Sequence, residues 1–196
     1  MTSRRLMFSP WLRGASQPRW SKIWVTDPDS VAEHTFYVTF YARQIAILIG
    51  WDGDLAGLVY RALTDDLEEV FTGDICGPVK ANFVDDVRLK AYVKRRMEDD
   101  MPFVLTELAE DREAHGEQEA DEINRIVKAA DQLDALLFLQ RELLRGNQTV
   151  EPSFKDAWNK FEGGWFNLPA GKETLARLWD TTIVPAVNDH QKALRF

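Results

Sequence analysis

The chain has 196 residues, of which 45% are hydrophobic and 29% are charged, and its formal net charge is -8. This length and balance indicate a globular protein with a hydrophobic core, organised as a single domain over residues 1–196. The acidic charge argues against a protein that coats nucleic acid or a membrane surface, because both need a basic face. No apolar run reaches the roughly 20 residues of a membrane span. The single Cys76 favours a reducing compartment, and we expect a cytoplasmic protein.

The N-terminal region predicts a short helix over residues 5–14, followed by a loop that runs to Pro28. Arg19 and Trp20 are adjacent in this loop. An arginine can bind phosphate, and a tryptophan can stack on a base or sugar. A lone tryptophan in a loop more often anchors that loop on the core, so both interpretations stay open.

The next segment has a strong helix start, because Ser30 and Glu33 have the spacing of a capping box. Apolar residues then recur at steps of three and four, which predicts a helix from Asp29 to about Ile49. His34 falls on its inward face. A single histidine on an apolar face is more often a hydrogen-bonded core residue than a metal ligand.

A third helix is predicted from Leu55 to about Phe71, with Asp54 as its N-cap. Its apolar stripe continues onto Asp66 and then Glu69. A carboxylate on a buried stripe is costly unless it is paired or binds a metal. The alternative is a solvated acidic helix end followed by a turn, since charge runs are usually solvated.

A loop is expected over Thr72–Lys80, and strand patterns are almost absent, so the predicted fold class is all-α. Asp131 interrupts an otherwise apolar stripe on one of the remaining helices. Those helices are predicted for residues 85–99, 102–109, 118–145, 154–162 and 173–194.

Inward-pointing polar residues therefore stand on three separate predicted helices: His34, the pair Asp65 and Asp66, and Asp131. One imidazole with two or three carboxylates suits a divalent metal. Glu69, one turn beyond Asp66, is placed to orient or deprotonate a water molecule.

The order of these motifs resembles that of HD-domain phosphohydrolases, in particular bacterial 5′-deoxynucleotidases and phage dATP triphosphohydrolases. The resemblance covers about residues 19–145, with residues 150–196 as a helical C-terminal extension, and it implies an HD-domain helical bundle. The motifs are Arg19-Trp20, Val31-Ala32-Glu33-His34, Glu69-Val70-Phe71-Thr72-Gly73-Asp74, Pro78-Val79-Lys80 and Lys128-Ala129-Ala130-Asp131.

The resemblance implies one divalent metal ion bound by His34, Asp66 and Asp131, with Glu69 acting on the attacking water. The chain departs from the family at one position, because the His-Asp pair of the motif is Asp65-Asp66 here. We expect Asp65 to ligate in place of the histidine, since the acids would otherwise form an unneutralised buried cluster. Among manganese, cobalt and magnesium, an added carboxylate favours manganese or magnesium. The alternative is that Asp65 does not reach, and that metal binding is weak or lost.

The resemblance also implies the substrate contacts. Arg19 would bind phosphate, Trp20 would pack on the deoxyribose, and Asp74 would bind the 3′-hydroxyl as part of the catalytic site. Lys80 is a further candidate for phosphate.

The leading hypothesis is a metal-dependent 5′-deoxynucleotidase that converts a deoxynucleoside monophosphate to deoxynucleoside and phosphate. A triphosphohydrolase that releases triphosphate from a dNTP is the alternative, for which Lys80, Lys90 and Lys94 would supply positive charge. A degenerate, non-catalytic nucleotide-binding module is a third possibility. The resemblance further suggests a homo-oligomer in a bacterial cytoplasm, or in the host cytoplasm if the chain is phage-encoded.

Overall fold

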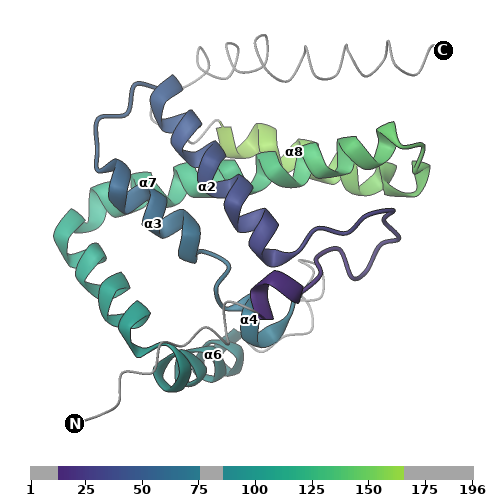
Figure 1. The fold of residues 1–196 in the computed structure, drawn as a ribbon. Helices are drawn as coiled ribbons and strands as arrows, with labels where there is room; N and C mark the ends of the chain where they lie inside the picture. The colour runs from purple at the N-terminus through teal and green to yellow at the C-terminus, as the bar shows by residue number, and fades with distance from the viewer. Residues whose placement is uncertain (1–12, 76–85, 166–196) are drawn as a thin grey trace.

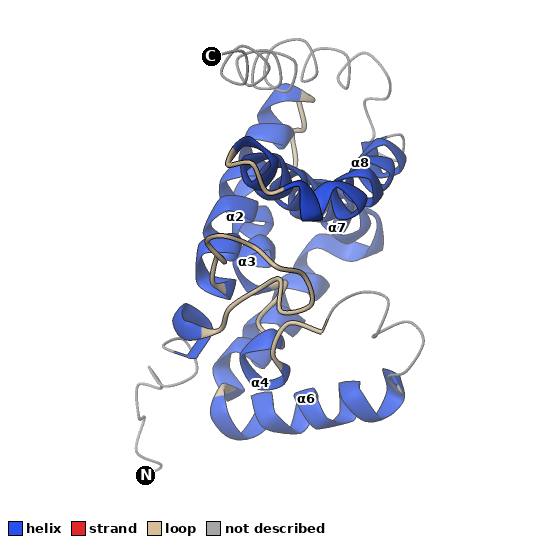
Figure 2. Ribbon diagram, turned by 90° about the vertical axis from the view of Figure 1, so that its right-hand side faces the viewer, coloured by secondary structure: helices blue, strands red, loops and turns tan. Residues whose placement is uncertain are grey.

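The computed structural model describes residues 13–75 and 86–165, and this part of the chain contains helices and no strand (Figure 2). The predicted all-α class is confirmed. The main elements in chain order are α2 (Val31–Leu48), α3 (Leu55–Thr64), α4 (Glu69–Thr72), α6 (Asp86–Asp100), α7 (Pro102–Leu144), the 3-10 turn η1 (Gln148–Val150) and α8 (Glu151–Trp165).

The long helix α7 is the centre of the arrangement, because α2, α3, α6 and α8 all pack against it. Figure 1 shows α2 crossing α7, and α8 returning along the C-terminal half of α7. The main core lies where α2, α3 and α7 meet, and Ile45, Leu58 and Ile126 are among its fully buried side chains. Burial of each such side chain contributes roughly 1.5–3 kcal/mol.

A smaller core joins α4 to α6 and to the start of α7, through Leu67, Val70, Val93, Met97 and Met101. It holds the segment that follows α3 against a second support (Figure 2). The acidic turn between α3 and α4 is therefore held by the main core on its α3 side and by the smaller core on its α4 side.

The start of α2 is formed as predicted. Ser30 Oγ accepts from the backbone N–H of Glu33 at 3.2 Å, and the backbone N–H of Ser30 donates to Glu33 Oε2 at 2.8 Å. Asp54 is also confirmed as an N-cap, since its carboxylate accepts from the N–H of Ala56 at 2.8 Å.

The single helix predicted for residues 55–71 is wrong, because α3 ends at Thr64 and α4 begins only at Glu69. The intervening backbone forms tighter turns, in which each hydrogen bond spans three residues instead of four. The N–H of Leu67 donates to Thr64 O at 3.3 Å, and the N–H of Glu69 donates to Asp66 O at 3.0 Å. Aspartate competes for backbone hydrogen bonds and is a poor interior helix residue. The break turns consecutive acids in different directions.

The predicted interruption between the helices at 102–109 and 118–145 is confirmed, because α7 (Pro102–Leu144) consists of two helical stretches joined across a kink at Gly116, but the first stretch continues beyond residue 109 as far as the kink. The one non-helical residue of α7 is Gly116, with φ 70° and ψ 172°, a backbone conformation that glycine adopts without steric cost. The polar segment before Gly116 is helical, and Gly116 changes the direction of the helix.

The C-terminal part differs from the prediction in one further respect. α8 begins at Glu151 and continues through Gly163 and Gly164, where a turn was expected, because packing along α7 outweighs the low helix propensity of glycine. The predicted helix over residues 173–194 and most of the one over residues 5–14 lie outside the described residues. No helix among those described is long and apolar enough to cross a membrane.

Candidate metal and nucleotide site

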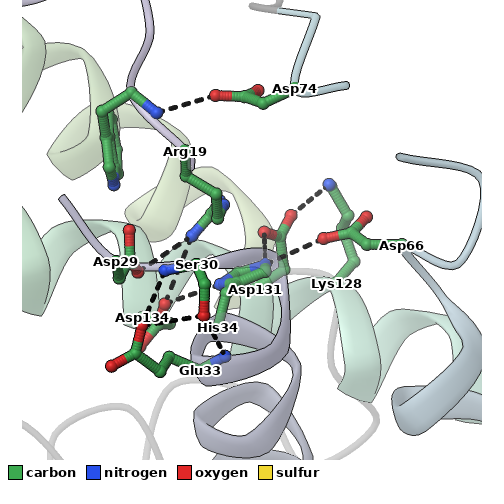
Figure 3. Close-up of polar contacts among 11 residues, drawn as sticks. Arg19, Asp29, Ser30, Glu33, His34, Asp66, Asp74, Lys128, Asp131 and Asp134 are labelled. Atoms are coloured by element: carbon green, nitrogen blue, oxygen red, sulfur yellow. Dashed lines mark hydrogen bonds and ion pairs between the residues drawn. The ribbon is translucent and has the colours of Figure 1, made fainter. Parts of the chain in front are cut away.

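His34 lies one turn into α2 and is 1% exposed, with its ring directed at α7 (Figure 3). Its Nε2 is 2.9 Å from Asp66 Oδ2 and 3.4 Å from Asp131 Oδ1. Asp66 belongs to the turn between α3 and α4, and Asp131 belongs to α7. The structure thus brings together one imidazole nitrogen and two carboxylates from three distant parts of the chain, all within 4.8 Å of one another.

The other nitrogen of His34 is held by Asp134, whose Oδ2 lies 2.6 Å from Nδ1. Burial lowers the pKa of His34, but the hydrogen bonds with Asp131, Asp134 and Asp66 outweigh it and raise this pKa well above its ordinary value. Asp134 is itself buried. A carboxylate on Nδ1 fixes the orientation of the ring and leaves Nε2 to face Asp66 and Asp131, which is the usual support for a metal-binding histidine.

The donor set fits a divalent cation. His34 offers Nε2, and Asp66 and Asp131 each offer one oxygen. Three protein ligands leave coordination positions open for substrate or water, as in catalytic rather than structural sites. A cation would also offset the negative charge that Asp65, Asp66 and Asp131 bring together, a charge to which Lys128 and Arg61 are the neighbouring counterions.

Lys128 lies one turn before Asp131 on α7 and forms a close ion pair with Asp131 Oδ2. Burial alone would raise the pKa of Asp131, but hydrogen bonds from His34 and Lys128 lower it strongly. The Lys128 side chain is 63% exposed. It therefore presents a solvent-accessible positive charge at the edge of the ligand group.

Asp65 does not join this group. Its Oδ1 accepts from Arg61 Nη2 at 2.7 Å, and Arg61 Nε also donates to Asn124 Oδ1 at 3.0 Å. Burial raises the pKa of Asp65, and Asp66 and Asp131 raise it further, whereas Arg61 opposes both effects. Metal ligation by Asp65 stays a prediction, and the structure gives this carboxylate a different partner.

Glu69 stands at the start of α4, and its Oε2 is buried with no hydrogen-bond partner among the described residues. Burial raises the pKa of Glu69 to about 8, and the charges of Asp66 and Asp74 add to this effect. A carboxyl group that is both buried and unpaired is typical of a functional position.

Arg19 lies on the side of the ligand group away from Asp66 and Lys128 (Figure 3). Arg19 Nη1 is 3.6 Å from both Asp29 Oδ2 and Asp134 Oδ2. One guanidinium therefore connects the loop to Asp134, the residue that holds His34. The N–H of Trp20 donates to Asp74 Oδ2 at 2.8 Å, and the Trp20 backbone has φ 65°. An unusual backbone conformation of this kind is maintained only where the surroundings enforce it.

The loop that carries Arg19 and Trp20 is fixed at several points. The Trp20 ring stacks on Phe138 with centroids 4.9 Å apart. The N–H of Thr26 donates to the buried Glu142 at 2.6 Å, and Asn147 Nδ2 donates to the carbonyl oxygen of Trp24 at 3.0 Å. These contacts hold the loop in place beside the ligand group.

A cavity of about 520 Å³ opens beside Asp131, a size suited to a small organic ligand. Its charged lining residues include Arg19, Asp74, Lys128 and Asp131, and α8 contributes to its wall. Its further lining residues are Trp20, Ser21, Lys22, Ile23, Gln132, Ala135, Leu139, Ser153, Asp156, Ala157 and Lys160. The remaining sequence candidate, Lys80, lies outside the described residues.

Sequence reasoning missed Asp134, Lys128 and Asp29. Asp134 follows Asp131 by three residues on the same buried stripe, so the argument applied to Asp131 applied to it equally. Lys128 was noted only as part of a motif. Asp29 had no local signal, because its partner Arg19 is identified only by the fold.

Comparison with known proteins identifies the family of the chain. Residues 15–164 match the family described as 5′-deoxynucleotidase YfbR-like. A 5′-deoxynucleotidase of Vibrio parahaemolyticus is 29% identical over 148 residues, covering 66% of this chain and 70% of that protein. A 5′-deoxynucleotidase of Photorhabdus laumondii is 31% identical over 136 residues, covering 66% of this chain and 69% of that protein.

Solved structures show the same fold at lower identity. The HD phosphohydrolase of cyanophage S-2L, bound to dA and one catalytic Zn²⁺ ion, has a TM-score of 0.66 and 23% identity, with 93% of this chain and 95% of that chain covered. An HD-domain phosphohydrolase from Listeria innocua has a TM-score of 0.64 and 17% identity, with 91% of this chain and 85% of that chain covered.

Proposed function

Because the chain belongs to the YfbR-like 5′-deoxynucleotidase family, we propose that it removes the 5′-phosphate from deoxynucleoside monophosphates. The resemblance to HD-domain phosphohydrolases and the predicted HD-domain fold are confirmed, and the protein is a hydrolase. The choice of substrate within that class is the proposal.

One observation carries it: the group formed by His34, Asp66 and Asp131 borders a cavity that also contains Arg19, Trp20 and Asp74. A divalent cation, a phosphate-binding arginine and an acceptor for a sugar hydroxyl are the elements that nucleotide phosphate hydrolysis needs. Asp131 connects the ligand group to the pocket that Arg19 and Asp74 line.

We assign one divalent metal ion to His34, Asp66 and Asp131, with Asp134 orienting the imidazole. When bound, the ion supplies Lewis acidity toward phosphate and water. Manganese, magnesium and cobalt remain the proposed ions, and the preference for manganese or magnesium depends on whether Asp65 leaves Arg61. The zinc ion of the cyanophage relative adds a fourth candidate.

Glu69 is the proposed base for the attacking water. Its buried Oε2 lies among the charges of Asp66 and Asp74, and additional positive charge near Asp66 would lower the Glu69 pKa toward that of an ordinary carboxylate. Water attacks phosphorus as Glu69 takes its proton, the bond from phosphorus to the 5′-oxygen of the nucleoside breaks, and the 5′-oxygen leaves as a hydroxyl after it takes up a proton from solvent. Arg19 and Lys128 are two of the cations that line the cavity, and they would stabilise charge on the phosphate oxygens.

Asp74 and Trp20 supply the proposed selectivity for deoxyribose. Asp74 Oδ2 is engaged by the Trp20 N–H, which leaves Oδ1 as an acceptor for the 3′-hydroxyl. The Trp20 ring, fixed on Phe138, would lie against the sugar and favour the less polar deoxyribose.

A triphosphohydrolase is the second candidate, and the cations along the cavity favour it. Lys22, Lys128 and Lys160 line the same pocket as Arg19, and a longer phosphate chain needs more positive charge. Lys94, which the sequence suggested for this role, pairs instead with Glu98 at 4.0 Å on α6.

Product analysis distinguishes the two functions. The purified protein is incubated with each dNMP, dNTP and the matching ribonucleotides, in separate reactions with Mn²⁺, Co²⁺, Mg²⁺ and Zn²⁺. Free phosphate from dNMPs supports the nucleotidase, and triphosphate from dNTPs supports the alternative. No turnover of either class with any of these ions would refute both.

We also propose that the protein is cytoplasmic, which rests on its single cysteine. A homo-oligomer is likewise proposed.

A further inference from the structure

Gln132 is a polar residue of the cavity for which the proposed reaction has no use. It follows the ligand residue Asp131 on α7, and it lines the same cavity. Its Oε1 is buried and has no hydrogen-bond donor among the described residues. A buried amide oxygen without a donor lowers the stability of a fold. In the lining of a cavity, such a group indicates a ligand that supplies the donor.

The indole Nε1 of Trp20 is in a similar state. Trp20 also lines the cavity, its Nε1 is buried, and no described residue accepts a hydrogen bond from it. The cavity therefore holds one acceptor and one donor that the described part of the chain does not satisfy. The acceptor is the more informative of the two, because a nucleotide has many atoms that accept hydrogen bonds and few groups that donate them.

Few groups of a deoxynucleotide can donate to Gln132. The charged phosphate oxygens accept hydrogen bonds, and Asp74 is the proposed partner of the 3′-hydroxyl. The N–H groups of the base are the donors that remain. Each of the four bases carries one beside an acceptor on its Watson–Crick edge. Adenine and cytosine have an amino group beside a ring nitrogen, and guanine and thymine have a ring N–H beside a carbonyl oxygen.

The position of Gln132 on α7 separates it from the phosphate. Successive residues of a helix leave its axis about 100° apart, so the side chains of Asp131 and Gln132 diverge. A nucleotide whose phosphate lies at the ligand group would therefore meet Gln132 with another part of the molecule. Apolar side chains from the loop, α7 and α8 also line the cavity and belong to one hydrophobic cluster, which suits the faces of a base: Ile23, Leu139 and Ala157.

We propose that Gln132 binds the Watson–Crick edge of the nucleobase, with Oε1 accepting an N–H of the base and Nε2 donating to the neighbouring acceptor. This inference rests on the proposed deoxynucleotide substrate and adds a contact to its base. The last torsion of a glutamine side chain is soft, so the carboxamide can turn both groups into the cavity. Paired in this way, Gln132 anchors any of the four bases and selects against a ligand that has no N–H.

The first test measures the binding of nucleosides, for which no hydrolysis is needed. Isothermal titration calorimetry with Mn²⁺ present compares deoxyadenosine with purine 2′-deoxyriboside, which has the same rings but no N–H on its base. The wild type should bind deoxyadenosine about tenfold more tightly, and Gln132→Met should bind the two nucleosides equally. Gln118→Met is the matched control, because Gln118 is exposed on the same helix and should keep the difference.

A second measurement separates a contact with the base from an indirect effect through Asp131. The Mn²⁺-induced rise in melting temperature should be equal in Gln132→Met and the wild type, because Gln132 is not a metal ligand. A smaller rise in the variant would assign the effect to Asp131 and overturn the proposal. Equal affinity of the wild type for the two nucleosides, no binding of deoxyadenosine, or a preference that survives Gln132→Met would also overturn it.

The same protein is then assayed with dAMP and with the 5′-monophosphate of purine 2′-deoxyriboside. The ratio of their kcat/KM values should fall about tenfold in Gln132→Met. A wild type that prefers deoxyadenosine in the binding test but hydrolyses neither monophosphate would support the contact with the base and refute the proposed nucleotidase. The two proposals can therefore fail separately.

Discussion

Asp134 should control metal affinity without touching the metal. In Asp134→Asn, the amide oxygen can still accept from His34 Nδ1, where the carboxylate oxygen now lies at 2.6 Å, but its negative charge is removed. Arg19 keeps Asp29 as a partner at 3.6 Å, so the fold should persist. Loss of such a supporting carboxylate typically lowers metal affinity about 10- to 100-fold.

The loss of metal affinity can be measured as a smaller stabilisation of the fold by the metal. At a fixed Mn²⁺ concentration well above the dissociation constant, 10- to 100-fold weaker binding removes about 1.4 to 2.7 kcal/mol of metal-induced stabilisation. For a domain of this size, each 1 kcal/mol shifts the melting temperature by about 2–4 °C. The Mn²⁺-induced rise in melting temperature should therefore be about 3 to 11 °C smaller in Asp134→Asn than in the wild type.

The assay is thermal unfolding with EDTA and with Mn²⁺, supported by direct Mn²⁺ titration. Asp121→Asn is the control, because Asp121 is an exposed aspartate on the same helix and should leave the metal effect unchanged. Equal Mn²⁺-induced shifts in the wild type and Asp134→Asn, with equal stability in EDTA, would show that Asp134 does not support a metal ligand.

Three further outcomes are expected. Asp65→Ala should change Mn²⁺ affinity less than about threefold, since Arg61 holds this carboxylate, whereas Asp66→Ala should reduce it about 100-fold or more; a large effect of Asp65→Ala would establish it as a ligand. Asp74→Asn should lower kcat/KM for a dNMP about 10- to 100-fold but leave that for the 2′,3′-dideoxy analogue unchanged, because only the former has the 3′-hydroxyl. In EDTA, the folded protein retains the Glu69 proton that the unfolded chain loses near pH 4.5, so the free energy of unfolding should fall as the pH rises from about 4.5 to 8. Urea titrations measure this dependence on pH, and Glu69→Gln should make it less steep. An unchanged dependence in Glu69→Gln would contradict the raised pKa.

Local patterns indicated the candidate residues, and the family resemblance implied that they form one ligand group. The capping box fixed the start of α2 and so the inward direction of His34. The apolar stripe of α7 indicated that Asp131 faces inward, and its side chain is 20% exposed. The contact between these residues could be inferred only because a buried carboxylate requires a partner.

The unexpected partner of Asp65 has a physical cause, which is that side-chain direction depends on where a helix is interrupted. The predicted helix through Asp65 and Asp66 could not anticipate that the backbone changes course after Thr64. Once it does, Asp66 points to His34 and Asp65 to Arg61. The pairing of Arg19 with Asp134 joins residues far apart in the chain, and no periodic pattern encodes it.

The glycine inside α7 has a consequence for how the chain can change in length. A helix rotates by about 100° per residue, so one deletion between residues 117 and 127 would turn Asp131 and Asp134 out of alignment together. A deletion between residues 103 and 115 would alter only the arm that packs on α6, because Gly116 does not transmit helical phase. Descendants of this chain should therefore tolerate gaps on the N-terminal side of that glycine and reject them on the other.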